Sequence, residues 1–142
     1  MELNEKQREF LQDHHAAAMI TTARDGTPKA VRVGVALVEG RLWSSGTADR
    51  VRTKRLRRDP RSTLFVFDKG PLYLSIESAV TILEGADAPR NNLDLFRVMQ
   101  SRPTGPLNWY GVELDEDAFL ARMVTERRLV YDFRPTNIYG AV

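Results

Sequence analysis

The densest charge in the sequence is a run of basic residues at positions 50–61. Small residues with hydroxyl groups, Ser44, Ser45 and Thr47, stand just before it. Guanidinium and ammonium groups form charge-assisted hydrogen bonds with phosphate, and the free N–H groups at a helix start attract anions. The pattern predicts a phosphate site where a strand ends and a helix begins. The run holds seven of the 21 lysines and arginines: Arg50, Arg52, Lys54, Arg55, Arg57, Arg58 and Arg61.

Two other interpretations of this run remain open. Arg50, Lys54, Arg57 and Arg61 recur at helical spacing, which suits a solvated helix face equally well. A nucleic-acid-binding module is the alternative from another class. Against it, the run has no interleaved aromatic residues for base stacking, and the net charge of the chain is only +2. We therefore expect a small anionic ligand and no nucleic acid.

Other chemistry finds little support in the sequence. His14 and His15 are adjacent and diverge on a helix, and the chain has no cysteine, so no metal site is expected. Neither a glycine-rich phosphate loop nor a nucleophile elbow is present. No catalytic acid or base is identified. Trp109, Tyr110 and Tyr139 are candidates for the walls of a substrate site, and the alternative for each is an ordinary aromatic residue of the core or the surface.

Length and composition favour a single domain over residues 1–142. Hydrophobic residues make up 42% and charged residues 28% of the chain, as in ordinary globular proteins. No apolar run approaches the roughly 20 residues that span a bilayer, and the N-terminus does not resemble a secretion signal. The expected location is the cytoplasm.

Hydrophobic periodicity predicts the elements that carry the basic run. Asn4 and Gln7 form a capping-box pattern for a helix at 4–14. Alternating apolar residues mark strands at 30–37 and 72–82, and the apolar run at 63–67 predicts a strand buried on both faces. A loop is expected at 101–111, and Pro135 is expected to separate the last strand from the C-terminus. The other expected elements are strands at 19–23, 41–45 and 129–133, and helices at 48–58, at 91–99 capped by Asn91 or Asn92, and at 115–126.

The order of these elements indicates a mainly β (α+β) fold. Three meandering strands, two further strands and a last strand suit a six-stranded antiparallel barrel of Greek-key type, with short helices at its flanks. A parallel α/β sheet is not supported, because strands and helices do not alternate.

The chain resembles the pyridoxamine 5'-phosphate oxidase-like FMN-binding split-barrel superfamily, and within it the deazaflavin-dependent oxidoreductases of actinobacteria. The resemblance spans almost the whole sequence. Its most specific motif is Arg52-Thr53-Lys54-Arg55-Leu56-Arg57-Arg58-Asp59-Pro60-Arg61; weaker ones are Thr21-Thr22-Ala23-Arg24-Asp25-Gly26-Thr27-Pro28 and the ending from Arg127-Arg128-Leu129 to Ile138-Tyr139-Gly140.

The resemblance implies a homodimer with two cofactor sites at the subunit interface. Arg52 and Lys54 would hold the cofactor phosphate, and the backbone of residues 29–33 would meet the edge of the ring. Small residues at Ala30 and Gly34 suit the close approach of a planar tricycle, and simple packing of the barrel is the alternative explanation for them. The full implied cofactor set is Arg52, Lys54, Thr53, Ser44, Ser45, Thr47, Lys29, Val31, Val33 and Arg57.

The implied activity is hydride transfer from coenzyme F420 to a small electron-poor organic substrate. Coenzyme F420 carries a phosphate and a polyglutamate tail, and the arginines beyond Lys54 would supply the extra positive charge. An FMN enzyme, or a carrier of FMN or F420, is the alternative within the fold. Vitamin B6 oxidation is not expected, because the C-terminal segment that those enzymes use for substrate is not found here.

Overall fold

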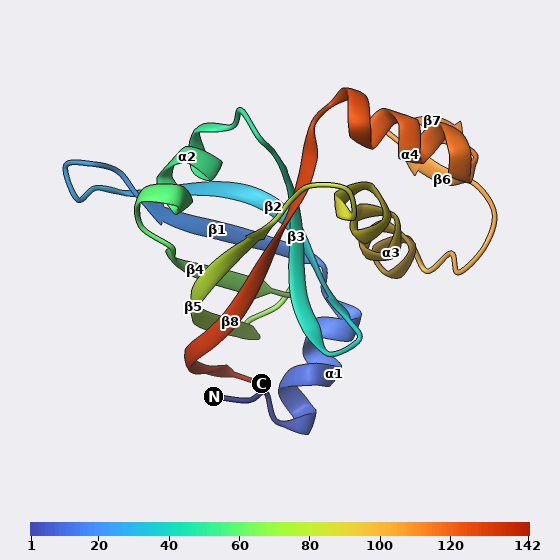
Figure 1. Ribbon diagram of the computed structural model, residues 1–142. Helices are drawn as coiled ribbons and strands as arrows, with labels where there is room; N and C mark the ends of the chain where they lie inside the picture. Colours follow the sequence, from blue (N-terminus) through green and yellow to red (C-terminus); the bar gives the residue numbers. More distant parts are fainter.

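A closed barrel of six antiparallel strands forms the body of the protein in the computed structural model, which describes residues 1–142 (Figure 1). The order around the barrel is β1-β2-β3-β8-β5-β4, and β4 pairs back with β1. Since β4 lies beside the first of three consecutive strands, the topology is a Greek key, as predicted. The barrel strands are β1 (Ala16–Thr22), β2 (Pro28–Val38), β3 (Arg41–Thr47), β4 (Arg61–Phe67), β5 (Tyr73–Leu83) and β8 (Arg128–Ala141).

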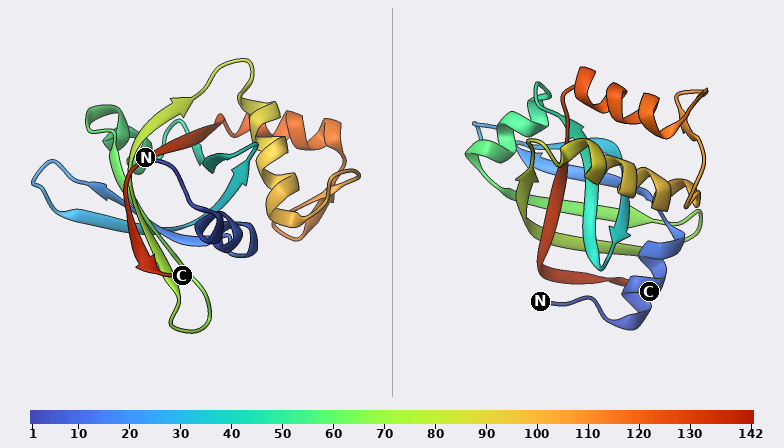
Figure 2. Two further views of the ribbon diagram at one scale, coloured as in Figure 1. Left: turned by 90° about the horizontal axis from the view of Figure 1, so that it is seen from below. Right: turned by 45° about the vertical axis from the view of Figure 1, so that its right-hand side comes forward.

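Four helices and a small hairpin surround the barrel. Helix α1 begins with the predicted capping box, in which Asn4 and Gln7 each accept the other's backbone N–H at 2.8 Å. Figure 2 shows α3, α4 and the hairpin grouped together outside the barrel. None of the helices is long and apolar enough to cross a membrane. These elements are α1 (Glu5–Asp13), α2 (Val51–Arg58), α3 (Ala88–Gln100), β6 (Leu107–Trp109), β7 (Val112–Leu114) and α4 (Glu116–Thr125).

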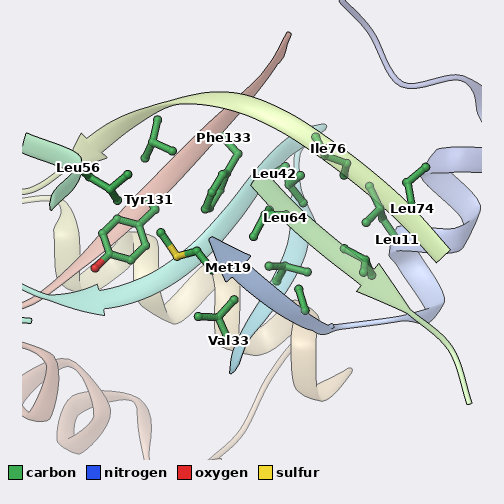
Figure 3. Packing of buried hydrophobic residues seen from close by; sticks show 14 of the residues in the cluster. Leu11, Met19, Val33, Leu42, Leu56, Leu64, Leu74, Ile76, Tyr131 and Phe133 are labelled. Carbon is green, nitrogen blue, oxygen red and sulfur yellow. The ribbon is translucent and has the colours of Figure 1, made fainter. Parts of the chain in front are cut away.

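The barrel interior holds the main hydrophobic core, a cluster of 16 buried residues. Figure 3 shows Leu11 of α1 and Leu56 of α2 at opposite ends of this cluster, so the two helices close the two ends of the barrel. Val33 and Val35 of β2 point into it, which confirms the alternation read from the sequence. Burying each large aliphatic side chain contributes roughly 1.5–3 kcal/mol. Helix α2 is therefore fixed to the barrel by its apolar face.

The α3, α4, β6 and β7 elements pack around a second, smaller core. Its fully buried members are Leu93, Leu107, Trp109, Phe119 and Met123. A loop was predicted for residues 101–111, but β6 and the hairpin turn fall in the last part of this range and β7 follows it, so the prediction was wrong there. The hairpin has a two-residue turn in which Tyr110 and Gly111 have φ angles of 50° and 86°, as a tight hairpin turn requires.

Two other sequence predictions fail at element boundaries. Strand β8 continues through Pro135, because the missing N–H falls beside an irregularity at Glu77 and Ser78, where the register shifts. Helix α3 begins after Asp87, with a proline in its first turn, and not at Asn91 or Asn92.

Strand β4 also differs from its prediction as a strand buried on both faces. Leu64 and Val66 are fully buried, but Phe65 and Phe67 are 36% and 41% exposed on the outer face. Tyr73 of β5 stacks on Phe65, with ring centroids 5.3 Å apart. The chain by itself therefore leaves an aromatic surface on the outside of the barrel.

Candidate functional site

The barrel opens between β2 and β3. The two strands pair only from Val35 opposite Ser44 to Val38 opposite Arg41. Beyond this point, β2 pairs with β1 alone and β3 with β8 alone. A cavity of about 420 Å³ lies at the opening. It is lined by Arg32, Val33 and Gly34 of β2, Ser45 of β3, Arg50 and Arg52 at the start of α2, Phe96, Met99 and Gln100 of α3, Tyr110, and Arg128 of β8. We call it the split pocket.

Backbone groups of β2 face the split pocket. The N–H of Val35 donates to the carbonyl of His15 at 2.7 Å, on the β1 side. Neighbouring residues of an antiparallel strand direct their backbone groups to opposite sides. Gly34 and Arg32 therefore face the β3 side, and the Ser44 hydroxyl does donate to the Gly34 carbonyl at 2.7 Å. The N–H and carbonyl of Arg32 lie farther along this open edge, where a ligand can bond to them.

Positive charge dominates the pocket. Four arginines line it, at positions 32, 50, 52 and 128, and no carboxylate does. Arg128 forms a salt bridge with Glu126. Arg32, Arg50 and Arg52 form none. The pocket therefore carries several charges that no group of the chain compensates.

Arg52 is the least satisfied of these arginines. Its Nε atom is buried without a hydrogen-bond partner, and its Nη2 atom lies a long 3.4 Å from the Ser45 carbonyl. Burial lowers the pKa of the Arg52 guanidinium, and the positive charges of Arg50 and Arg128 lower it further. Tyr131 acts in the opposite direction and raises this pKa; its ring centroid lies 5.8 Å from the guanidinium carbon. Desolvating a cation without an anionic partner costs free energy. An anion in the split pocket would compensate that cost.

The N-terminal end of α2 adds to this preference for anions. Arg50 is the N-cap residue and makes no side-chain capping hydrogen bond. The N–H groups of Thr53 and Lys54 donate to the Arg50 carbonyl, while those of Val51 and Arg52 precede any acceptor that the helix can offer. The helix dipole places partial positive charge at the same end. Side chains, backbone and dipole thus favour the same kind of ligand.

Three predicted hydroxyl residues hold the structure around the pocket. The Thr53 hydroxyl is fully buried, donates to the Thr47 carbonyl at 2.7 Å and contacts the Tyr131 hydroxyl. The Thr47 hydroxyl donates to Asp49 at 2.7 Å. Ser44, as described, bonds to β2. These side chains position α2 and the split between the strands, and they do not line the cavity. Ser45 does line it.

The remaining predicted residues are distributed over different surfaces. Arg52 and Val33 lie in the split pocket, whereas Lys29 and Lys54 line a neighbouring cavity of about 560 Å³ together with Arg24, Arg55 and Arg58. Arg57 pairs with Glu84 at 2.6 Å on the exposed face of α2, and the side chain of Val31 packs against the barrel core. Because residues two apart on a helix do not share a face, α2 separates Arg52 from Lys54.

Several residues of the split pocket were not predicted as site residues. Arg128 lies 76 positions after Arg52 in the sequence, and only the pairing of β3 with β8 brings it near. Arg32 lies within residues 29–33, whose backbone was predicted to meet the ring, but its side chain was not among the predicted site residues. Tyr110 had been noted as a wall candidate, and it does line the pocket, at 80% exposure. Trp109 is core and Tyr139 lies on the outer barrel face.

Gly34 fits the predicted need for a small residue beside the ligand. It lines the split pocket, and a Cβ placed on it would lie 2.9 Å from the sulfur of Met99. A side chain here would push Met99 and narrow the cavity.

Comparisons with known proteins agree with this architecture. Among solved structures, a conserved hypothetical protein of Mycobacterium tuberculosis superposes with a TM-score of 0.74 and 19% identity over 97% of this chain and 84% of the other. An F420 reductase gives 0.71 and 20%, over 96% of this chain and 98% of that one. The heme storage protein HutZ of Vibrio cholerae gives 0.67 and 11%, over 98% and 94%. These likenesses concern the fold.

The sequence itself is matched by one family profile. No curated protein matches it. The profile described as pyridoxamine 5'-phosphate oxidase covers residues 3–129, which is nearly the whole chain and includes every residue that lines the split pocket. The chain therefore belongs to the pyridoxamine 5'-phosphate oxidase family, whose fold is the split barrel.

Proposed function

We propose that this protein is an oxidoreductase that binds coenzyme F420 in the split pocket and reduces a small electron-poor organic substrate. The observation that carries the proposal is the buried Nε of Arg52, which has no partner within the chain. A phosphate group at the N-terminal end of α2 would accept from this guanidinium and from the free N–H groups beside it. The same interactions suit the phosphate of FMN, which is the second candidate.

The open edge of β2 supports a planar ring next to that phosphate. The backbone of Arg32 and the small residue Gly34 allow a flat heterocycle to bond along the strand. Phe96 and Met99 of α3 provide an apolar wall, and Tyr110 stands at the mouth. Bound F420 supplies hydride chemistry. The chain orients the ring and excludes water from one of its faces; no side chain of the pocket is assigned as acid or base.

The charge around α2 favours F420 over FMN. Beyond the split pocket, α2 presents Lys54, Arg55 and Arg58 to the neighbouring cavity, together with Lys29. Coenzyme F420 carries carboxylates in addition to its phosphate, whereas FMN carries the phosphate alone. A second basic surface close to the phosphate site is therefore expected to strengthen F420 binding by long-range attraction.

We also propose that the protein is a homodimer in the cytoplasm. The supporting observation is the outer face of β4 and β5, where the exposed Phe65 and Phe67 and the half-buried Tyr73 form an aromatic group next to the exposed Leu72. Large aromatic residues are enriched at subunit interfaces. A second copy on this face would bury Phe65 and Phe67, which the apolar run at 63–67 predicted to be buried.

A fluorescence titration with F420 and with FMN, side by side at physiological salt, tests the proposed function. We expect micromolar or tighter binding of F420 and binding of FMN at least about tenfold weaker. A preference for FMN would move the protein to the FMN alternative. Binding of neither cofactor would refute the proposal. Tight binding without turnover of quinones or other activated alkenes would indicate a carrier.

A further inference from the structure

Arg128 enters the split pocket with its guanidinium held by two neighbours. Its side chain is only 8% exposed. Its Nε donates a hydrogen bond to Oε1 of Glu126 at 2.9 Å, and its Nη2 lies 2.9 Å from the same oxygen in a salt bridge. The guanidinium carbon lies 4.9 Å from the centroid of the Trp109 ring. Arg127, between the two partners, has a φ angle of 52° and turns the chain from α4 into β8. A planar guanidinium fixed in this way directs its remaining N–H groups in a defined direction.

Glu126 is anchored in turn by the small core. It ends α4 as the C-cap residue, and its Oε2 accepts from the indole Nε1 of Trp109 at 3.2 Å. Trp109 is 4% exposed and packs edge-to-face against Phe96 and Phe119. The carboxylate therefore has little freedom to move. A rigid chain of contacts leads from the small core through Glu126 to the pocket.

We propose that Arg128 of β8 binds the anionic group of the ligand together with the arginines at the start of α2, and that Glu126 is a positioning residue acting through Arg128. The proposal rests on the function proposed above, since it gives a role to residues of the same pocket. Arg50, Arg52 and Arg128 line the same cavity. A phosphoryl or carboxylate group between them would accept hydrogen bonds from β8 as well as from α2.

The sign of one substitution separates positioning from simple electrostatics. Glu126→Gln removes a negative charge close to the pocket while keeping the size of the side chain and an acceptor oxygen. If the charge of Glu126 acted only on the field of the pocket, its loss would tighten anion binding. If Glu126 positions Arg128, the looser guanidinium weakens binding by about five- to tenfold.

The experiment is an isothermal titration of the full chain with inorganic pyrophosphate at constant ionic strength. The matched control is Glu116→Gln, which also removes one negative charge from α4. Glu116 pairs with Arg90, with 3.6 Å between the two charged groups, and it does not line the pocket. We expect the control to change the dissociation constant less than about twofold. Arg128→Met should weaken binding at least about tenfold.

A double variant provides the readout that a merely structural role would not produce. In the Arg128→Met background, Glu126→Gln should change pyrophosphate binding by less than about twofold, because the residue it acts through is gone. An equal weakening in both backgrounds overturns the proposal, as does unchanged or tighter binding by Glu126→Gln alone. If Glu126→Gln does not fold, Arg128→Lys keeps the charge but loses the planar fork; unchanged binding by that variant also overturns it.

This test is independent of the cofactor. Wild-type protein that binds no pyrophosphate would refute the role of Arg128. Protein that shows the expected pyrophosphate pattern but binds neither F420 nor FMN would leave this inference standing and refute only the proposed cofactor.

Discussion

Replacing Arg52 by methionine is expected to change stability and ligand binding in opposite directions. The guanidinium is partly desolvated, and its Nε has no partner. An unsatisfied buried polar group costs about 1–3 kcal/mol. Methionine keeps the apolar part of the side chain and removes the buried charge, together with the guanidinium contact with the Tyr131 ring. We therefore expect Arg52→Met to raise the free energy of unfolding of the ligand-free protein by about 1 kcal/mol, or roughly 3–4 °C in Tm for a chain of this size.

The same substitution should weaken binding of F420. Hydrogen bonds from a guanidinium to a phosphate contribute about 2–3 kcal/mol together, which corresponds to roughly 30- to 150-fold in the dissociation constant. At the same concentration of F420, the ligand should therefore stabilise the Arg52→Met protein less than the wild type, because stabilisation by a ligand grows with the ratio of its concentration to Kd. Thermal unfolding with and without F420, together with the fluorescence titration, measures both quantities on one preparation.

Lys54→Met is the matched control, since it removes one charge from the same helix. Lys54 is exposed and lines the neighbouring cavity, so we expect its loss to weaken F420 binding by no more than about threefold. An Arg52→Met protein that is less stable than the wild type without ligand would show that the guanidinium is a structural group. Equal losses of affinity in both variants would refute the separation of the two residues by α2.

Three further predictions concern stability and assembly. Gly46→Ala places a methyl group onto the buried Tyr131 ring, and a urea unfolding curve should show a loss of about 1–3 kcal/mol. Hydrogen bonds from Arg61 lower the pKa of Asp59 from 3.8 to about 2. The ionised carboxylate contributes its full stabilisation above about pH 4, and this contribution is lost as the pH falls towards 2. Asp59→Asn should remove this pH-dependent part of the free energy of unfolding, which is about 0.5–1 kcal/mol for a solvent-screened pair. Phe65→Asp should turn the proposed dimer into monomers in sedimentation equilibrium, because it places a charge in the aromatic surface.

Each of these predictions has a result that contradicts it. Gly70→Ala is the control for the glycine, since its Cβ would meet only ordinary contacts at 3.6 Å or more; equal effects at the two positions would refute the clash with the ring. If the free energy of unfolding of Asp59→Asn follows that of the wild type from pH 5 to pH 2, the ion pair between Asp59 and Arg61 has no net effect on stability. Val124→Asp places the same charge on the exposed surface of α4 and should leave the oligomeric state unchanged. Wild-type protein that sediments as a monomer would rule out the proposed dimer.

The strands of the barrel could be predicted from the sequence because burial imposes a period of two on them. Val33 and Val35 alternate with small or charged residues, and this alone identified both the strand and its core face. Helix α1 could be placed from its cap, since the pairing of Asn4 with Gln7 is local. Such predictions succeed where the determining contacts lie within a few residues.

The β6–β7 hairpin could not be predicted because its turn depends on contacts from elsewhere. A tyrosine with positive φ is unusual, and nothing local requires it at Tyr110. The Asn108 side chain accepts from the Gly111 N–H at 3.2 Å, and Gln100 of α3 forms two hydrogen bonds with the Asn108 backbone, at 2.8 and 2.9 Å. The turn is thus held by a helix that packs against it only in the folded protein.

The sequence by itself determined the barrel core, the position of α2, and the presence of a basic site at the start of that helix. These features depend on hydrophobic period, on caps and on the clustering of like charges along the chain. Only the tertiary structure decided that Arg52 and Lys54 face different cavities and that Arg128 joins the first of them. Helix geometry separates neighbours in sequence, while the pairing of β3 with β8 brings distant residues together. A binding site depends on how side chains are arranged in space, whereas the sequence alone specifies only their order along the chain.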